Sequence, residues 1–341
     1  MNIRTTWKWI ALALVAGGML AVTPAAPAAA TPKERAVWPP APSEPRIAFV
    51  QFITGPRDLG WRPPFWRKLG NWITGDQGES LNLRKPFAIA LDERGNICLT
   101  DTDARLLCYC DLAKKNWLRF DGAGKTKFVT PVAAARRHGI FYVADSTLGR
   151  VFAFKEDGKV LFELGAPLKR PVGLAVTDDE MLVVDVLAQA VFVFDLNGKL
   201  VFTFGKRGTG PGEFNYPTSV AVDGRGHLVV SDTLNCRVQV FDMRGKFLSQ
   251  FGGNGDTSGH FSRPKGVAVD AAGNIYVVDA LFDNFQIFNL AGQLLLNVGE
   301  TGTQPGGFGL PNGIAIGADN RIYVADTFNH RVQVFQYLGQ P

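Results

Sequence analysis

The sequence contains six copies of one residue pattern between residues 86 and 336. A proline opens each copy, with spacings of 45, 40, 46, 47 and 47 residues: Pro86, Pro131, Pro171, Pro217, Pro264 and Pro311. An aspartate ends the second β-type run, with spacings of 44, 40, 47, 47 and 47 residues: Asp101, Asp145, Asp185, Asp232, Asp279 and Asp326. Because both markers keep one period, residues 46–341 are predicted to form a single repeat domain.

Each copy holds short β-type runs separated by turns. The last copy, PNGIAIGADNRIYVADTFNHRVQVF at 311–335, divides into GIAI, RIYVAD and RVQVF, three expected antiparallel strands. A fourth run follows in copies two to five, at 159–165, 199–205, 246–253 and 293–300. A period of 40 to 50 residues with four strands per copy is typical of a β-propeller, so we expect an all-β, six-bladed fold.

The last copy ends after its third strand, and an additional strand precedes the first copy. RIAFVQFITG at 46–55 alternates in the same way as the fourth strand KLVFTFG at 199–205. We therefore expect this N-terminal strand to complete the last blade and close the ring, which removes two exposed sheet edges.

Small residues alternate along the strand after each proline. The residue four positions past the proline is always alanine: Ala90, Ala135, Ala175, Ala221, Ala268 and Ala315. The residue two positions past it is alanine, glycine or serine, while the intervening residues, such as Val267 and Val269, are bulky. This pattern predicts the innermost strand of each blade, which crowds its neighbours and lines a central channel.

The copies resemble NHL repeats. The resemblance is carried by P-x-G-[VI]-A-[VI]-D, G-x-[IL]-[YV]-V-[AS]-D and D-T-x-N-x-R-[VI]-Q-V-F, which copies four (217–241) and six (311–335) match almost throughout. Copy five lacks the arginine, and copies one to three diverge further. The resemblance covers residues 46–336 and implies a six-bladed propeller. It implies no single activity, because propellers include both binding proteins and enzymes.

The repeated charged residues are interpreted as framework. An aspartate at the start of a loop accepts backbone N–H bonds and fixes the turn, so the six aspartates are expected to be structural rather than catalytic. Arg150, Arg237 and Arg331 occupy one register and are expected to donate hydrogen bonds to loop carbonyls or to an adjacent blade.

The N-terminus has the features of an export signal. Arg4 and Lys8 precede a 13-residue apolar run, Ile10 to Val22, and an A-x-A site at 28–30. We expect a signal peptide at 1–30, a flexible Pro/Ala-rich leader at 31–45 and a periplasmic or secreted protein. An uncleaved anchor is the alternative, although the run is shorter than the ~20 residues of a spanning helix. Removing the two cations of 1–30 lowers the net charge from +5 to +3, and no basic stripe indicates a nucleic-acid partner.

Function is expected where the copies differ, on the face that carries the channel mouth. The residues just past each proline form a rim of three apolar, one cationic and two neutral polar side chains: Phe87, Val132, Val172, Thr218, Lys265 and Asn312. The candidate binding residues are Thr218, Lys265 and Asn312 from this rim, with Phe282, Asp283, Phe328 and His330 from the neighbouring loops. The rim offers too few hard oxygen or imidazole ligands to predict a metal, and no cofactor is expected.

Residues 54–82 are an insertion that no other copy contains. The spacing of apolar residues predicts an amphipathic helix at about 65–74, and the segment 61–73 carries Trp61, Phe65, Trp66 and Trp72. It is a candidate plug over the channel, docking site or peripheral membrane contact, or it packs against the propeller itself.

The first copy carries three of the four cysteines, Cys98, Cys108 and Cys110. Because Cys98 and Cys110 are symmetric about the expected hairpin turn, we predict a disulfide between them, with Cys98–Cys108 and packed free thiols as alternatives.

Three functions remain open for this chain. It is expected to be an exported monomeric scaffold that binds a protein, glycan or small-molecule ligand through the loop face. The alternatives are a metal-dependent hydrolase or lyase, similar to lactonase-like or amidating-lyase-like propellers, and a ligand-sensing module.

Overall fold

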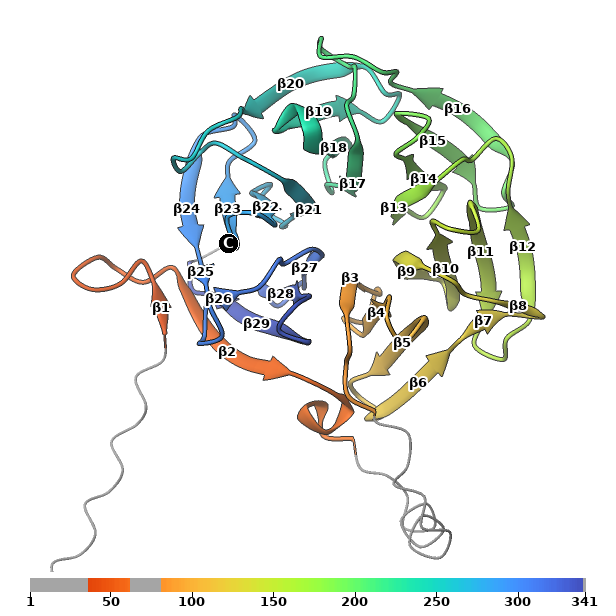
Figure 1. Ribbon diagram of the computed structural model, residues 1–341, viewed down its shortest axis with the longest axis horizontal. Coiled ribbons are helices and arrows are strands. Elements are labelled where there is room, and N and C mark those ends of the chain that lie inside the picture. Colours follow the sequence, from red (N-terminus) through yellow and green to blue (C-terminus); the bar gives the residue numbers. More distant parts are fainter. Residues whose placement is uncertain (1–35, 62–80, 340–341) are drawn as a thin grey trace, which may run out of the picture. The chain divides into compact units, whose positions relative to one another are not determined.

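The computed structural model describes residues 36–61 and 81–339, which form a ring of six β-sheets around a central opening (Figure 1). Within these residues, five sheets have four antiparallel strands and the sixth has five. Each blade runs from an innermost strand at the opening to an outermost strand at the perimeter. The six-bladed all-β fold expected from the repeats is confirmed.

The first three blades follow the repeats in chain order. Blade 1 contains β3 (Pro86–Leu91), β4 (Ile97–Asp101), β5 (Leu106–Asp111) and β6 (Asn116–Phe120). Blade 2 contains β9 (Pro131–Arg137), β10 (Ile140–Asp145), β11 (Arg150–Lys155) and β12 (Val160–Leu164). Blade 3 contains β13 (Pro171–Val176), β14 (Glu180–Asp185), β15 (Ala190–Asp195) and β16 (Leu200–Phe204).

The next three blades repeat this order, and the last of them includes the N-terminal strands. Blade 4 contains β17 (Pro217–Val222), β18 (His227–Asp232), β19 (Arg237–Asp242) and β20 (Phe247–Gly252). Blade 5 contains β21 (Pro264–Val269), β22 (Ile275–Asp279), β23 (Asn284–Phe288) and β24 (Leu294–Val298). Blade 6 contains β27 (Ile314–Ile316), β28 (Arg321–Asp326), β29 (Arg331–Tyr337), β2 (Ile47–Ile53) and β1 (Val37–Trp38).

Short elements connect the blades. They are the 3-10 turns η1 (Pro56–Leu59) and η2 (Thr233–Asn235), the hairpin β7 (Gly122–Ala123) and β8 (Thr126–Lys127), and the parallel pair β25 (Glu300–Thr301) and β26 (Gly307–Phe308). The linkers into blades 4, 5 and 6 each bury one phenylalanine completely: Phe214, Phe261 and Phe308. No helix among the described residues is long and apolar enough to cross a membrane.

The hydrophobic core is divided into six clusters, and each cluster lies between two adjacent blades. The middle strands are buried over most of their length, as in β10, where Phe141 to Asp145 are all buried. A sheet buried on both faces explains why these runs are continuously apolar rather than alternating.

The N-terminal strand closes the ring, as the sequence predicted. β2 pairs antiparallel with β29 from Ile47 opposite Tyr337 to Ile53 opposite Val332. Ile47 packs in the cluster between blades 5 and 6, and Ile53 packs in the cluster between blades 6 and 1. The strand therefore contributes to two inter-blade cores as well as to one sheet.

The small residues near the axis make room for the backbone of the next blade. The N–H of Gly266 donates to the carbonyl of Asn312 over 3.0 Å, and that of Gly313 donates to the carbonyl of Phe87 over 2.9 Å. A Cβ atom on Gly266 would lie 2.4 Å from the Asn312 carbonyl oxygen. The crowding that the alternating small residues predicted is thus a direct backbone contact between innermost strands.

Deletion of residues 46–53 is expected to open the ring. The deletion removes Ile47 and Ile53 from two cores and exposes the edge of β29. Losing two buried isoleucines at about 1.5–3 kcal/mol each should lower the melting temperature by roughly 10 °C and promote association. Size-exclusion chromatography and calorimetry measure both effects. A monomer with an unchanged melting temperature would contradict ring closure by β2.

Gly266→Ala is expected to destabilise the ring by about 1–3 kcal/mol, because the added methyl clashes with the Asn312 carbonyl. Gly224→Ala is the matched control, since nothing lies within 4 Å of its Cβ position. Urea unfolding compares the two variants. Equal stabilities would show that the close approach at the axis carries no cost.

Candidate functional site

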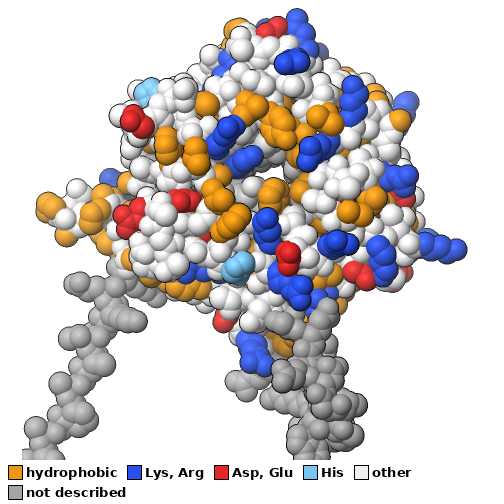
Figure 2. Space-filling view, viewed as in Figure 1, with side chains coloured by type: hydrophobic (Ala, Val, Ile, Leu, Met, Phe, Trp, Pro, Cys, Tyr) orange, Lys and Arg blue, Asp and Glu red, His pale blue; other side chains and the backbone are white. Residues whose placement is uncertain are grey.

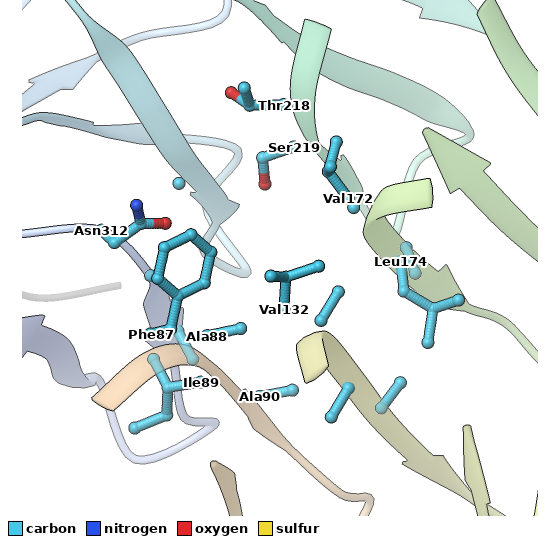
Figure 3. A pocket seen from close by; sticks show the side chains of 18 of the residues that line it. Phe87, Ala88, Ile89, Ala90, Val132, Val172, Leu174, Thr218, Ser219 and Asn312 are labelled. Carbon is cyan, nitrogen blue, oxygen red and sulfur yellow. The ribbon is translucent and has the colours of Figure 1, made fainter. Parts of the chain in front are cut away.

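The central opening is a cavity of about 680 Å³ lined by the innermost strands of all six blades. Its walls are mostly alanine, glycine and branched aliphatic residues, and its two ends differ in the side chains they present. Figure 3 shows the side chains of Phe87, Val132 and Val172 directed into the opening from three different blades. The innermost strands therefore form a channel lined mostly by small and aliphatic residues, with a surface that is both polar and apolar.

The mouth of the channel has an apolar half and a polar half. Each blade contributes the residue that follows its opening proline, and all six of these residues line the cavity. Blades 1, 2 and 3 contribute Phe87, Val132 and Val172, whereas blades 4, 5 and 6 contribute Thr218, Lys265 and Asn312. The three rim residues predicted for binding therefore stand side by side in consecutive blades.

Lys265 is the cation of this rim. Its side chain is half-buried and has no hydrogen-bond or ion-pair partner among the described residues. Burial lowers the pKa of the Lys265 ammonium, and the neighbouring Arg263 lowers it further, while Asp279 acts in the opposite direction. Asp279 is already engaged, because its carboxylate accepts the backbone N–H groups of Ser262 and Arg263.

The six repeat aspartates accept backbone hydrogen bonds, as expected from their place at the start of a loop. Each is buried and accepts backbone N–H groups from the linker that precedes its own blade. Asp145, for example, accepts the N–H groups of Val129 and Thr130 at 2.7 and 2.9 Å and those of Thr147 and Leu148 at 3.1 and 3.0 Å. One carboxylate thus ties a linker to a loop in each blade.

Two of the three repeat arginines extend this clamp. Arg237 contacts Asp232 at 2.9 Å and donates to the carbonyls of Thr209, Gly210 and Glu213. Arg331 contacts Asp326 at 2.7 Å and donates to the carbonyls of Thr303 and Gly307. The expectation was wrong for Arg150, which is exposed and pairs with Glu163 of its own blade. The linker into blade 2 instead forms the short hairpin of β7 and β8.

A second set of residues on this face is apolar and exposed. The residue two positions after the repeat aspartate is Leu187, Leu234, Leu281 or Phe328 in blades 3 to 6, with exposed fractions of 55, 41, 57 and 56%. We call these four residues the apolar ring. Of the four, the sequence analysis singled out only Phe328. An alignment of the six loops would have identified the three leucines, because they occupy the position of Phe328. Blades 1 and 2 have Asp103 and Thr147 at this position.

Cations lie among these apolar side chains. Figure 2 shows Lys and Arg side chains and hydrophobic side chains gathered around the central opening. Lys85 and Arg170 line the cavity and are exposed, Arg263 is exposed beside Lys265, and the Lys85 ammonium lies 5.2 Å from the centre of the Phe328 ring. Asp103 is the exposed carboxylate that lines the mouth, and it lies 3.7 Å from Arg84.

The other predicted loop residues have local contacts. The Asp283 carboxylate is buried and accepts hydrogen bonds from the Thr301 hydroxyl and the Leu310 N–H, at 2.8 and 2.7 Å. His330 is exposed, and its Nδ1 is paired with the Arg84 carbonyl. Phe282 is half-buried, and its N–H donates to Asp279. Asp283 and His330 therefore fix connections between blades rather than line the channel.

The insertion is described only at its ends. Trp61 is half-buried and lines a separate cavity of about 540 Å³ with Trp117 and Cys108, at the side of blade 1. The predicted helix at 65–74, with Phe65, Trp66 and Trp72, lies outside the described residues. So does the predicted signal peptide at 1–30.

The predicted disulfide between Cys98 and Cys110 is wrong. All four cysteines are free, and Cys98 pairs in register with Tyr109, not with a cysteine. The hairpin register differs by one residue from the expected symmetry, and a one-residue shift moves a side chain to the other sheet face. Cys98 packs between blades 1 and 2, whereas Cys108 and Cys110 pack between blades 6 and 1. The same register excludes the alternative pairing of Cys98 with Cys108.

The described residues contain no group of three or more His, Cys, Asp or Glu side chains placed to hold a metal ion. What the mouth offers chemically is three cations without an ion-pair partner among the described residues (Lys85, Arg170 and Lys265), two neutral polar groups and an apolar surface. This combination suits the binding of an anion that also carries apolar groups.

Comparisons with known proteins agree with the ring. The NHL repeat model matches residues 261–288 and 308–335, and a 6-bladed beta-propeller model matches residues 165–228. The chain is a six-bladed propeller, and two of its blades match the NHL repeat model. No curated protein matches the sequence.

Several solved structures share this fold at low identity. A catalytically inactive virginiamycin B lyase from Staphylococcus aureus, solved with quinupristin, is 11% identical with a TM-score of 0.56, covering 74% of this chain and 94% of that one. Hydrazine synthase from Kuenenia stuttgartiensis is 12% identical with a TM-score of 0.54, covering 78% and 99%. A protein of unknown function from Bacteroides thetaiotaomicron is 14% identical with a TM-score of 0.57, covering 76% and 70%. These identities show a shared fold alone.

Asp326→Ala is expected to destabilise the protein by about 3–5 kcal/mol, because it leaves the buried Arg331 guanidinium without its carboxylate. It also removes the acceptor of the Gly309 N–H and of the Asn329 side chain. Asp103→Ala, at an exposed aspartate, should change stability by less than about 0.5 kcal/mol. Denaturant unfolding measures both. A similar loss in the two variants would contradict the clamp.

Proposed function

We propose that this NHL-repeat propeller is an exported binding protein that docks an acidic polypeptide partner on the face around its channel mouth. The observation that carries the proposal is the apolar ring, four exposed residues at one repeat position, surrounded by cations. Export is supported by the charged, apolar and A-x-A segments of residues 1–30.

The position of the apolar ring distinguishes it from ordinary surface leucines. Single exposed apolar side chains are common on soluble proteins and need no explanation. Leu187, Leu234, Leu281 and Phe328 instead share one loop position and one face across four consecutive blades. Loop side chains held by a rigid ring are a typical place for binding residues. Burying such apolar residues on binding favours association.

The charge of the face determines the chemistry of the partner. Lys85 and Arg170 are exposed at the mouth, and Arg263 is exposed in a separate cavity beside Leu234 and Leu281. None of the three forms an ion pair with a described residue. A positive surface attracts a negative partner and raises the association rate. The ring extends over four blades, which suits an extended polypeptide better than a compact ligand. An acidic segment with interspersed apolar residues therefore matches both features.

The similarity to propeller lyases supports the fold and not a reaction. The lyase structures are 11% identical to this chain, and active sites differ among proteins that share a propeller. The rim and the apolar ring, which vary between the blades, consist of residue types that suit the binding of a partner rather than a reaction.

Binding can be tested with a labelled peptide in which Asp and Leu alternate. The variant in which Leu187, Leu234, Leu281 and Phe328 are all replaced by Ser should bind about 10- to 100-fold more weakly, because apolar area is no longer buried. Binding should also weaken with salt, since the cations are exposed. Fluorescence anisotropy measures both effects.

A matched control replaces four exposed leucines on the outermost strands, Leu161, Leu200, Leu248 and Leu295, by Ser. This variant should bind like the wild type. A peptide of alternating Lys and Leu should bind poorly to every variant. Equal losses in the two quadruple variants, or tighter binding of the cationic peptide, would contradict the proposal.

A further inference from the structure

We propose that the channel is a second, small-molecule site, which binds an apolar carboxylic acid with its carboxylate on Lys265 and its chain inside the channel. This site is separate from the apolar ring, and it does not rest on the proposed partner surface.

Lys265 has the surroundings of an anion anchor. Its side chain is half-buried at the channel mouth, and no hydrogen bond or ion pair to a described residue neutralises it. Burying a charge without a partner is costly, so charged groups in such positions are normally paired. Arg263 adds repulsion, and the Asp279 carboxylate is occupied by backbone N–H groups. A carboxylate placed beside Lys265 would supply the missing partner.

The neighbouring rim residues can complete the contact with a carboxylate. Asn312 and Thr218 hold the equivalent positions in the two adjacent blades and line the same cavity. The Asn312 carboxamide has no partner among the described residues, whereas the Thr218 hydroxyl is shared with Thr233 over 2.7 Å. The amide of Asn312 is therefore free to donate to the second carboxylate oxygen.

The opposite half of the mouth and the interior suit an apolar chain. Phe87, Val132 and Val172 point into the opening from the three blades that lack polar rim residues (Figure 3). Below them the walls are formed by alanines and glycines with Ile89 and Leu174. The cavity of about 680 Å³ lies in the size range of small-molecule sites.

The far end of the channel cannot hold the carboxylate equally well, which sets the direction of the ligand. Arg136 and Arg137 line that end, but both are paired within the protein. Arg136 contacts Asp92 at 2.8 Å, and Arg137 contacts Asp178 at 2.6 Å. At the mouth, Lys265 is unpaired, and Arg170 adds positive potential without a described partner. The acid group is therefore expected at the mouth.

Isothermal titration of the full protein with dodecanoate tests the site, with methyl dodecanoate and dodecylammonium as comparison ligands. One dodecanoate should bind per protein. The ester and the amine should bind at least about tenfold more weakly, because they lack the charge that pairs with Lys265. Shortening the acid should weaken binding by up to about fourfold per methylene, as apolar contact is lost. Equal affinity for acid and ester, or no binding of any alkanoate, would overturn the proposal.

Substitutions of Lys265 test whether this residue binds the carboxylate. Lys265→Met keeps the length and removes the charge, and it should weaken dodecanoate binding at least about tenfold. Lys265→Arg should retain most of the affinity, and Lys155→Met, at an exposed lysine on β11, is the matched control. An unchanged affinity in Lys265→Met would overturn the assignment. Thermal melting of each variant verifies that it is folded.

Two further experiments determine whether the carboxylate belongs to a free acid or to a polypeptide C-terminus, and whether this site is distinct from the apolar ring. A leucine-rich peptide with a free C-terminus supplies the same chemistry as the acid, and its amidated form does not. Tighter binding of dodecanoate assigns the site to a free acid; tighter binding of the peptide would overturn that assignment in favour of a polypeptide C-terminus. The quadruple serine variant of the apolar ring should still bind dodecanoate, so the two proposals can fail independently.

Discussion

The middle strands of every blade bury both faces against neighbouring blades, so each hydrophobic cluster belongs to two blades at once. A single blade would leave two apolar faces in water, and an open ring would leave one on each terminal blade. The ring must therefore close. β2 meets this requirement from the far end of the sequence, because Ile47 and Ile53 enter the clusters on either side of blade 6. Closure by a strand from the other terminus makes the ring one cooperative unit.

The joints between blades use the repeated residues, and this leaves defined positions free to vary. The six aspartates accept N–H groups of the linkers, and Gly266 and Gly313 donate to the backbone of the adjacent blade. Thr233 and Thr327, just after two of the aspartates, donate to the carbonyls of Pro264 and Pro86 in the next blade. At the residue after each proline and in the apolar ring, such contacts are made by the backbone, apart from the Thr218 hydroxyl that bonds Thr233, so the side chains are free to vary. These positions carry the rim and the apolar ring.

The fold was predictable from the sequence because its signals are repeated. The prolines and aspartates identified the blades, and the alternation at 46–55 identified the closing strand. Single features were less reliable. Predicting the cysteine pairing required the exact register of the hairpin. The expected symmetry placed Cys98 opposite Cys110, whereas Cys98 lies opposite Tyr109. Arg150 has the spacing of Arg237 and Arg331 but lacks their linker, so its partner was predicted wrongly. The rim residues were found because they follow the prolines, whereas Leu187, Leu234 and Leu281 resemble ordinary loop residues until their exposure is known.

The division of the mouth into two chemical halves follows from these free positions. A sixfold repeat with identical rim residues would have a uniform mouth, able to recognise only a symmetric ligand. Here the apolar rim residues come from blades 1 to 3 and the polar ones from blades 4 to 6, so the mouth can orient an asymmetric, amphipathic ligand. Substitutions at exposed positions typically change stability by less than about 0.5 kcal/mol. The apolar ring, whose four residues are exposed, can therefore acquire binding chemistry while the cores between the blades remain unchanged.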